Sequence, residues 1–258
     1  MTTPISENFP ESIVRENIKR LTPYSTARDE SNVGYGTYLD ANENPYNTGY
    51  NRYPDPHQKT LKRELALKKG VNEDMIFAGN GSDEAIDLVI RVFCEPGRDN
   101  ILSIEPTYGM YKVAASINDI EYREAPLKDD FSLDSQALLK LTDKNTKVIF
   151  LCSPNNPTGN LLDKESVLSV VKEFKGLVVV DEAYGDFSGD SGNIPLLKEY
   201  PNLVVLQTMS KSMGMAALRV GFAFGDSRVI SYLNRVKYPY NLNRVSQEMA
   251  TRRIKEGS

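Results

Sequence analysis

The chain has 258 residues, of which 40% are hydrophobic and 26% charged, with 31 basic against 35 acidic side chains and a formal net charge of −4. At about 150 residues per domain, this length indicates one large domain, or one domain and part of another, with a core that needs no disulfides or metals. The composition excludes global disorder, and the slightly acidic balance offers no electrostatic footprint for nucleic acid or an anionic membrane.

A single histidine and two cysteines narrow the chemistry further. His57 alone cannot build a site that needs several histidines, so we expect no bound metal, and we expect His57 to be a solvated loop residue. Cys94 and Cys152 end apolar runs and predict buried thiols in a reducing compartment. The first twenty residues lack the apolar core of a signal peptide, and no run approaches the ~20 apolar residues of a membrane span. We therefore predict a soluble, cytoplasmic protein with no membrane partner.

In chain order, a short helical pattern over residues 13–21 comes first, followed by a polar stretch over 26–36, and together they predict an arm. Short apolar, β-branched runs then predict buried strands. These runs cover residues 75–78, 100–104, 147–151, 177–180 and 203–206. A last helical pattern begins at 246 and continues to the end of the chain.

Helical spacing of apolar residues lies between these strands. Residues 86–93 follow Ser82 and Asp83, which are favourable N-cap types, and residues 167–174 follow Asp163. Apolar strands that alternate with helices predict an α/β fold, a three-layer sandwich with a mostly parallel central sheet. Ligands of such sheets bind at the carboxyl ends of the strands. The motifs that follow each strand are therefore the candidates for chemistry.

The first two strand ends carry a glycine-rich turn and an amide. The segment Gly79-Asn-Gly-Ser-Asp-Glu84 leads directly into a helix, and close backbone approach at a helix N-terminus is typical of phosphate sites. It is not a Walker motif, and an ordinary strand-to-helix turn fits it equally well. Asn156 follows residues 147–151 within a Pro- and Asn-rich turn, where it either serves the turn or donates to a ligand oxygen.

The later strand ends carry an acid and a lysine. Asp181 ends the run 177–180, where a buried acid is unfavourable unless it meets a cation, a metal or a proton-bearing ligand, with a helix N-cap as the alternative. Lys211 follows residues 203–206; such lysines are usually solvated, but desolvation would make the amine a nucleophile toward aldehydes. Together with Tyr108 and Arg219, these groups suit a planar, phosphorylated aldehyde that contains a pyridine ring.

Seven motifs between residues 21 and 219 resemble the fold-type I pyridoxal-phosphate aminotransferases. They are Leu21-Thr-Pro-Tyr24, Leu39-Asp-Ala-Asn-Glu-Asn-Pro45, Arg52-Tyr-Pro-Asp-Pro56, Gly79-Asn-Gly-Ser-Asp-Glu84, Ser153-Pro-Asn-Asn-Pro-Thr-Gly159, Asp181-Glu-Ala-Tyr184, and Ser210-Lys211 with Arg219. The second and third favour the histidinol-phosphate subgroup. The resemblance implies a homodimer that binds pyridoxal phosphate and exchanges an amino group between L-histidinol phosphate and 2-oxoglutarate, giving glutamate, in histidine biosynthesis.

The resemblance also implies roles for individual residues. Lys211 would carry the cofactor covalently and then move the proton of the substrate's Cα. Asp181 would pair with the pyridine nitrogen and keep it protonated, so that the ring acts as an electron sink. Asn156 and Tyr184 would hydrogen-bond the ring's 3′ oxygen, and Tyr108 would stack on the ring.

Other residues would bind the phosphate and the substrate. The phosphate group would be held by Gly81, Ser82, Asp83, Thr208, Ser210 and Arg219. Tyr53 would reach the phosphate of the neighbouring subunit's cofactor, and Tyr24 and Asn44 would lie near the substrate.

Proteins with these motifs usually continue into a smaller C-terminal domain that carries an anion-binding arginine. We therefore expect an N-terminal arm (1–35), a cofactor-binding large domain (36–245) and the start of a helix (246–258) that leads to an absent domain, with impaired transamination as the consequence. Alternatives within the cofactor family are an aromatic aminotransferase and a threonine-phosphate decarboxylase. If the protein is not an enzyme, the alternative is a non-catalytic domain that binds pyridoxal phosphate.

Overall fold

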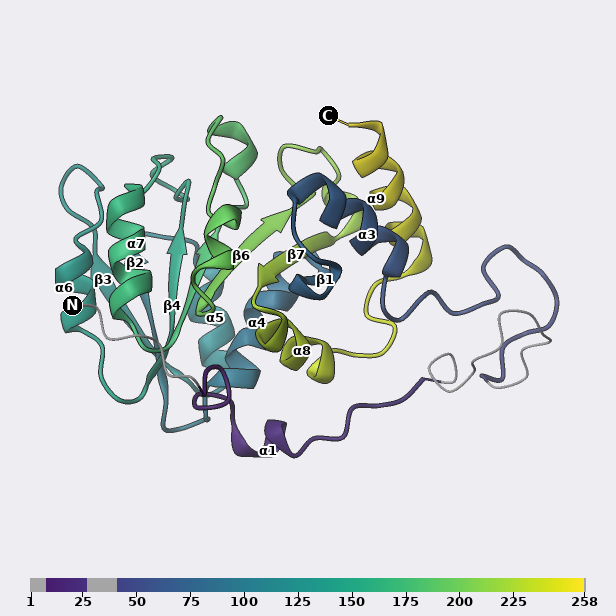
Figure 1. Cartoon of the computed structure of the whole chain (residues 1–258), viewed down its shortest axis with the longest axis horizontal. Helices are drawn as coiled ribbons and strands as arrows, with labels where there is room; N and C mark the ends of the chain where they lie inside the picture. The colour runs from purple at the N-terminus through teal and green to yellow at the C-terminus, as the bar shows by residue number, and fades with distance from the viewer. Residues whose placement is uncertain (1–7, 27–40, 258) are drawn as a thin grey trace.

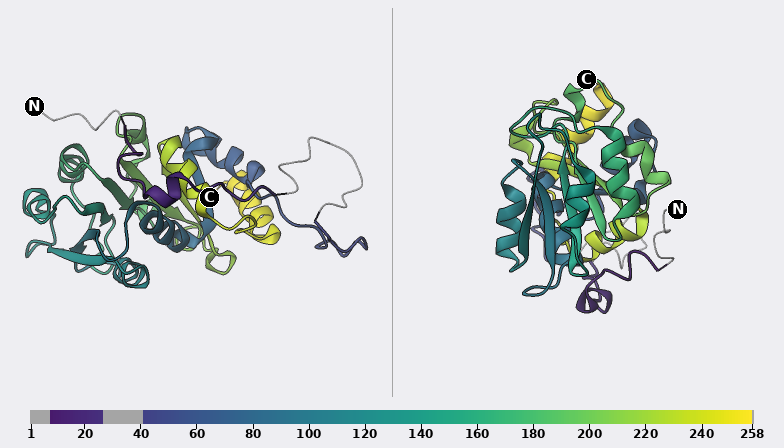
Figure 2. Two further views of the ribbon diagram at one scale, coloured as in Figure 1. Left: turned by 90° about the horizontal axis from the view of Figure 1, so that it is seen from below. Right: turned by 90° about the vertical axis from the view of Figure 1, so that its left-hand side faces the viewer.

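The computed structural model describes residues 8–26 and 41–257. Their centre is one seven-stranded sheet with strand order β1-β7-β6-β5-β4-β2-β3 (Figure 1). Helices cover both faces of this sheet, as the edge-on view in Figure 2 shows. The described residues therefore form the predicted three-layer α/β architecture.

The sheet is mostly parallel, as predicted. Its strands are β1 (Ile76–Asn80), β2 (Asn100–Glu105), β3 (Glu121–Pro126), β4 (Thr146–Cys152), β5 (Leu177–Asp181), β6 (Leu203–Thr208) and β7 (Val220–Gly225). The five strands β3, β2, β4, β5 and β6 pair in parallel, whereas β7 runs antiparallel to both β6 and β1. The carboxyl ends of the parallel strands therefore meet at one edge.

The helices divide between two cores, one on each face of the sheet. They are α1 (Glu16–Lys19), α3 (Lys59–Lys69), α4 (Gly81–Phe93), α5 (Met110–Ile117), α6 (Ser135–Lys140), α7 (Lys164–Glu173), α8 (Ser227–Val236) and α9 (Arg244–Glu256), with 3₁₀ turns η1 (Glu73–Met75), η2 (Gly185–Phe187), η3 (Ile194–Lys198) and η4 (Ala216–Leu218). Helices α3, α6, α7 and α9 pack on one face, and α1, α4, α5 and α8 pack on the other. Strands buried on both faces explain the continuous apolar runs.

Two strands were not predicted from the sequence. Strand β3 lies at the edge of the sheet and reads Glu-Tyr-Arg-Glu-Ala-Pro, so its charges conceal it. Strand β7 contains Gly221, which interrupts its apolar pattern. A Cβ atom at Gly221 would lie 2.2 Å from the backbone nitrogen of Ser82, so this glycine lets β7 approach the first turn of α4.

The N-cap residue of α4 is neither of the two predicted candidates, Ser82 and Asp83. The helix begins at Gly81 with Asn80 as the N-cap residue, so that Ser82 and Asp83 lie inside its first turn. The Glu84 carboxylate accepts hydrogen bonds from the backbone N–H of Asn80 and from the side chain of Asn241. Because Glu84 and Asn241 secure this end, Ser82 and Asp83 are available to face the adjacent cavity. The predicted cap of α7 is confirmed, since Asp163 accepts from the backbone N–H of Ser166 at 2.9 Å.

The two ends of the described chain pack on this framework. Helix α1 is shorter than the predicted 13–21, and Phe9, Val14 and Ile18 anchor its segment in the core. Helix α9 begins at Arg244 and lies beside α3. Most of the predicted polar stretch 26–36, two residues of the 39–45 motif and Ser258 lie outside the described residues, and the division into an arm, a large domain and a leading helix stays a prediction.

The two cysteines and the histidine lie as predicted. Cys94 and Cys152 are buried and unpaired, and His57 is exposed in a loop. Within residues 8–26 and 41–257, no helix has both the length and the apolar character needed to cross a membrane.

Candidate active site

A cavity of about 120 Å³ lies where the strand ends meet the start of α4. The last residues of β4, β5 and β6 all open onto it. Its lining consists of Gly81, Ser82, Asp83, Tyr108, Cys152, Asn156, Asp181, Ala183, Tyr184, Thr208, Ser210, Lys211 and Arg219. Every residue that the sequence placed at the cofactor, except Tyr53, is therefore brought to one cavity. Cys152 joins them because it pairs with Asp181 across β4 and β5, and Ala183 joins them because it precedes Tyr184 on the same turn.

Asp181 is a buried acid at the floor of this cavity, with 2% of its surface exposed. Its Oδ2 accepts a hydrogen bond from the Tyr111 hydroxyl at 2.8 Å, and its Oδ1 accepts from the backbone N–H of Ala183 at 3.0 Å. Burial raises the pKa of Asp181 from 3.8 to about 6, and these two hydrogen bonds oppose that rise. No lysine or arginine of the described residues forms an ion pair with this carboxylate. A cationic ligand would satisfy it.

Lys211 supplies an amine on another wall of the cavity. It follows β6, and its Nζ lies 5.1 Å from the centroid of the Tyr184 ring, within the range of a cation–π contact. Tyr184 comes from the turn after β5, so the two parallel strand ends bring together residues far apart in sequence. The arrangement places an amine and a phenol over one opening.

The opposite end of the cavity is suited to an anion. Helix α4 begins there, and its N-terminal N–H groups carry the positive end of the helix dipole. Arg219 reaches the same place because Gly81 lacks a side chain, since a Cβ atom there would lie 2.6 Å from the guanidinium. Thr208 and Ser210 add two hydroxyls, whose oxygens are 3.0 Å apart.

Asp83 stands at this anion-binding end with a carboxylate of its own. Its Oδ2 lies 3.2 Å from the Arg219 guanidinium, and its Oδ1 accepts from the Tyr108 hydroxyl at 3.2 Å. Burial, followed by the nearby Asp83 charge, raises the pKa of Tyr108 to about 12, so the phenol keeps its proton. The side chain of Asp83 therefore holds Arg219 and Tyr108, an arrangement that the sequence did not predict.

The two adjacent asparagines after β4 have different surroundings. The buried Asn155 donates to the backbone oxygen of Pro106 and to the Thr158 hydroxyl, and its own oxygen accepts from Thr107. These contacts hold the turn in shape. Asn156 instead lines the cavity, as predicted.

Three predicted residues lie away from the cavity. Tyr53 is half-exposed, and its ring stacks on Tyr240 with 4.4 Å between centroids. Tyr24 is 74% exposed and lines a different hollow, beside His57. Asn44 lies in an exposed loop, where its side chain accepts from the backbone N–H of Tyr46. Their predicted roles toward a neighbouring subunit or a substrate stay predictions.

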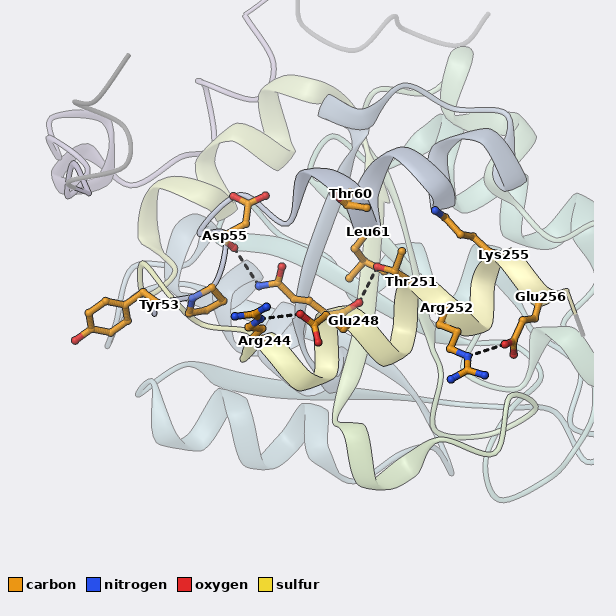
Figure 3. Close-up of a pocket in the computed structure, with 12 residues that line it drawn as sticks. Tyr53, Asp55, Thr60, Leu61, Arg244, Glu248, Thr251, Arg252, Lys255 and Glu256 are labelled. Carbon is orange, nitrogen blue, oxygen red and sulfur yellow. Dashed lines mark hydrogen bonds and ion pairs between the residues drawn. The ribbon is translucent and has the colours of Figure 1, made fainter. Parts of the chain in front are cut away.

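A larger hollow of about 610 Å³ is lined by α9, by the start of α3 and by the segment that precedes α3. Figure 3 shows its charged side chains paired along α9, Arg244 with Glu248 and Arg252 with Glu256. Such pairs at i, i+4 are those of a solvated helix. Although this hollow is larger, none of the residues that line the strand-end cavity also line it.

Two supporting residues were missed from the sequence. Tyr111 follows Tyr108 by one turn and reaches Asp181 from α5. Glu182 is buried, and its carboxylate accepts from the backbone and side chain of Asn193 and from Gln207. Glu182 thereby connects the turn after β5 to the end of β6. The only sequence feature that could have indicated a role for Glu182 is its position directly after Asp181.

The donor set fits pyridoxal phosphate. Asp181 is a buried carboxylate that needs a proton-bearing cation, which a pyridinium nitrogen provides. The start of α4, with Arg219, matches a phosphate group, and the Lys211 amine matches an aldehyde. The carboxylate, the anion-binding helix end and the amine all line one small cavity.

Comparisons with known proteins agree with this site. The family model described as "Aminotransferase class I and II" matches residues 39–256. Histidinol-phosphate aminotransferases of Bacteroides fragilis (strain YCH46) and Parabacteroides distasonis are 55% and 54% identical to this chain over 93% of its length. The chain spans 70% of the length of each of these relatives.

Solved structures show the same fold. The histidinol-phosphate aminotransferase from Clostridium acetobutylicum matches 80% of this chain and 63% of its own, with a TM-score of 0.71 and 26% identity. The L-threonine-O-3-phosphate decarboxylase from Porphyromonas gingivalis matches 80% of this chain and 64% of its own, with a TM-score of 0.69 and 24% identity, which shows the fold alone. From the site, the family model and the curated relatives together, the chain belongs to the class I and II aminotransferases and, within them, to the histidinol-phosphate aminotransferase family.

Proposed function

We propose that the protein transfers an amino group between L-histidinol phosphate and 2-oxoglutarate, with pyridoxal phosphate as its cofactor. The observation that carries the cofactor assignment is the buried Asp181, which lacks a cationic partner among the described residues and shares one cavity with Lys211 and Arg219. The choice of substrates is supported by the names of relatives that are more than 50% identical.

The residues of the chain would hold the cofactor at three places. Asp181 would keep its ring nitrogen protonated, and the N-terminus of α4 and Arg219 would bind its phosphate. Asn156 and Tyr184 would donate hydrogen bonds to the ring oxygen, and the Tyr108 ring would limit its movement. When bound, the group supplies an electron sink for the negative charge that develops at the substrate's Cα.

Lys211 would perform the acid–base step. Its Nζ would hold the cofactor at the aldehyde position, and as a free amine it would take the proton from the substrate's Cα and later return one. The nearby Tyr184 ring keeps this amine oriented toward the cavity, since the two groups already form a cation–π contact. Lys211 would thus transfer the proton, and Asp181 would stabilise the charge on the ring.

We further propose a cytoplasmic homodimer in which Tyr53 of each subunit serves the neighbouring site. In support, Tyr53 is half-exposed, does not line its own chain's cavity and stacks on Tyr240. Tyr24 and Asn44, both exposed, would contribute to substrate binding once such a dimer forms. Sedimentation equilibrium with and without pyridoxal phosphate measures the assembly directly.

One assay separates the candidate reactions. The chain loaded with pyridoxal phosphate is given 2-oxoglutarate and, in turn, histidinol phosphate, phenylalanine or threonine phosphate, and glutamate and CO₂ are measured. Glutamate formed fastest from histidinol phosphate supports the proposal. Faster transfer from phenylalanine favours an aromatic aminotransferase, and release of CO₂ from threonine phosphate favours the decarboxylase; either result contradicts the proposal. A Lys211→Ala chain is the blank.

A further inference from the structure

Tyr111 connects the hydrophobic core beneath the cavity to Asp181. The residue belongs to α5 and is completely buried, with 0% of its surface exposed. Its ring stacks on Phe150 at 4.8 Å between centroids and meets the edge of the Tyr108 ring at 5.6 Å. These contacts hold the ring in place, with its hydroxyl beside Asp181 and the Cys152 thiol. The hydroxyl donates to Oδ2 of Asp181 at 2.8 Å.

The two hydrogen bonds that Asp181 accepts differ in whether they depend on the identity of the donor residue. Oδ1 accepts from the backbone N–H of Ala183, two residues further on, which any residue at 183 other than proline would provide. Oδ2 accepts from a side chain 70 residues away in sequence. Only the second bond depends on the choice of amino acid, because phenylalanine would fill the same space at 111 without a donor.

The surroundings of Asp181 otherwise oppose its charge. Burial and the nearby carboxylates of Asp83 and Glu182 all favour the neutral form. The Cys152 thiol stays protonated because burial raises its pKa to about 12, so it adds no charge. The Tyr111 hydroxyl is the largest of the influences that favour the ionised carboxylate, ahead of the N–H of Ala183. Its own pKa lies well above the usual value, so it remains a donor at all physiological pH values.

We propose that Tyr111 is a positioning residue for the reaction, whose hydroxyl fixes the orientation of the Asp181 carboxylate and keeps it ionised for a cationic ring nitrogen. The inference rests on the proposed function for the identity of that cation. The loss of a hydrogen bond to a charged group changes an equilibrium constant by about tenfold or more. Tyr111 does not line the cavity, so it would act on the reaction through Asp181.

The test begins with the cofactor-free protein. Carbon-13 NMR of carboxyl-labelled aspartate follows the titration of Asp181, which is assigned by its loss in Asp181→Asn. Tyr111→Phe should lower the acid dissociation constant of Asp181 by about tenfold. The matched control is Tyr122→Phe, which removes one hydroxyl from a half-buried tyrosine of β3 that interacts with Ser103. An unchanged titration in Tyr111→Phe, or an equal change in the control, would overturn the proposal.

A second substitution changes the hydrogen bond without removing it. 3-Fluorotyrosine incorporated at Tyr111 has a more acidic hydroxyl and is a stronger donor, so the acid dissociation constant of Asp181 should rise. This direction is opposite to that of Tyr111→Phe, and loss of packing could not produce both. If Tyr111→Phe does not fold, the fluorinated protein decides alone, and a fall or no change in the constant rejects the proposal.

Cofactor binding gives a readout that is independent of turnover. The dissociation constant of pyridoxal phosphate should rise in Tyr111→Phe, whereas that of its 1-deaza analogue, which lacks the ring nitrogen, should not. Equal weakening of both ligands would mean a structural role only and would contradict the inference. The titration and binding measurements use no amino donor. They can therefore be interpreted even if the proposed substrates do not react, and a negative result for Tyr111 does not affect the substrate assay.

Discussion

Asp83 and Arg219 form an ion pair across the mouth of the cavity, 136 residues apart in sequence, with Oδ2 and Nη2 separated by 3.2 Å. Both side chains are substantially exposed, at 39% and 50%. An ion pair of this exposure contributes little to stability. Arg219 is thus already aimed at the place where α4 begins, and exchanging its carboxylate partner for a phosphate requires little free energy.

The first prediction concerns Arg219→Lys. A lysine cannot reproduce the planar fork of donors, so the affinity for pyridoxal phosphate should fall by about 10- to 100-fold. The free energy of unfolding of the cofactor-free chain should change by less than about 0.5 kcal/mol, because the ion pair is exposed. Fluorescence titration and urea unfolding measure the two quantities.

Arg228→Lys is the matched control for Arg219→Lys, since Arg228 forms an exposed ion pair with Asp226 at the start of α8. It should leave both the affinity and the stability unchanged. If Arg219→Lys binds pyridoxal phosphate as tightly as this control does, the anion-binding end of the cavity is misassigned.

The second prediction concerns the pH dependence of Asp181. Because burial raises its pKa from 3.8 to about 6, the folded cofactor-free protein binds this proton more tightly than the unfolded chain does. Its contribution therefore lowers stability as pH rises through the interval from about 4 to about 6. Asp181→Asn removes that loss and should be more stable than the wild type by about 3 kcal/mol at pH 8.

Urea unfolding of the cofactor-free wild type and Asp181→Asn at several pH values checks this prediction. The difference between the two should be small near pH 4 and should reach its full size above pH 6. The same variant should exchange the Cα proton of its substrate far more slowly than the wild type does, although it still binds the cofactor. If the difference in unfolding free energy between the two proteins does not change with pH, the pKa of Asp181 is not raised in the folded protein, and the prediction is wrong.

The third prediction concerns the close approach of β7 to α4. In Gly221→Ala, the new methyl group would start 2.2 Å from the backbone nitrogen of Ser82, and neither backbone can move freely. We expect destabilisation of about 1–3 kcal/mol together with weaker phosphate binding, because the first turn of α4 must shift.

Gly109→Ala provides the control for that substitution. Gly109 precedes α5 with φ of −63°, and a Cβ atom there would meet nothing within 4 Å. Its unfolding free energy and its affinity for inorganic phosphate should match those of the wild type. If Gly221→Ala behaves in the same way in thermal unfolding, the contact between β7 and α4 is not a constraint.

Much of the fold was predictable because its strands are apolar on both faces. The five predicted strands appear with boundaries shifted by at most two residues, and the order of motifs at their ends led to the cavity. Strand β3 was missed because an edge strand carries charges, and β7 because Gly221 serves the neighbouring helix rather than the strand pattern. Neither the edge position of β3 nor the contact of Gly221 with α4 can be inferred from the local amino-acid composition.

The contacts within the site were less predictable than its members. The hydrogen bond from Tyr111 to Asp181 joins α5 to β5, and no sequence pattern links these two elements. Asp83 was expected to bind the phosphate, but in the structure its carboxylate pairs with Arg219. Such contacts depend on how helices pack against the sheet. Tyr24, Asn44 and Tyr53 lie away from the cavity, so their roles require the partner and the substrate.

The central claim is that Lys211 is the amine that holds the cofactor. Borohydride reduction of the protein loaded with pyridoxal phosphate, followed by peptide mapping, tests it most directly. The account predicts a single labelled residue, Lys211, and no label in Lys211→Ala. Label on Lys198 or on Lys237, whose amine already donates to the backbone oxygens of Pro56 and Pro239, would contradict it.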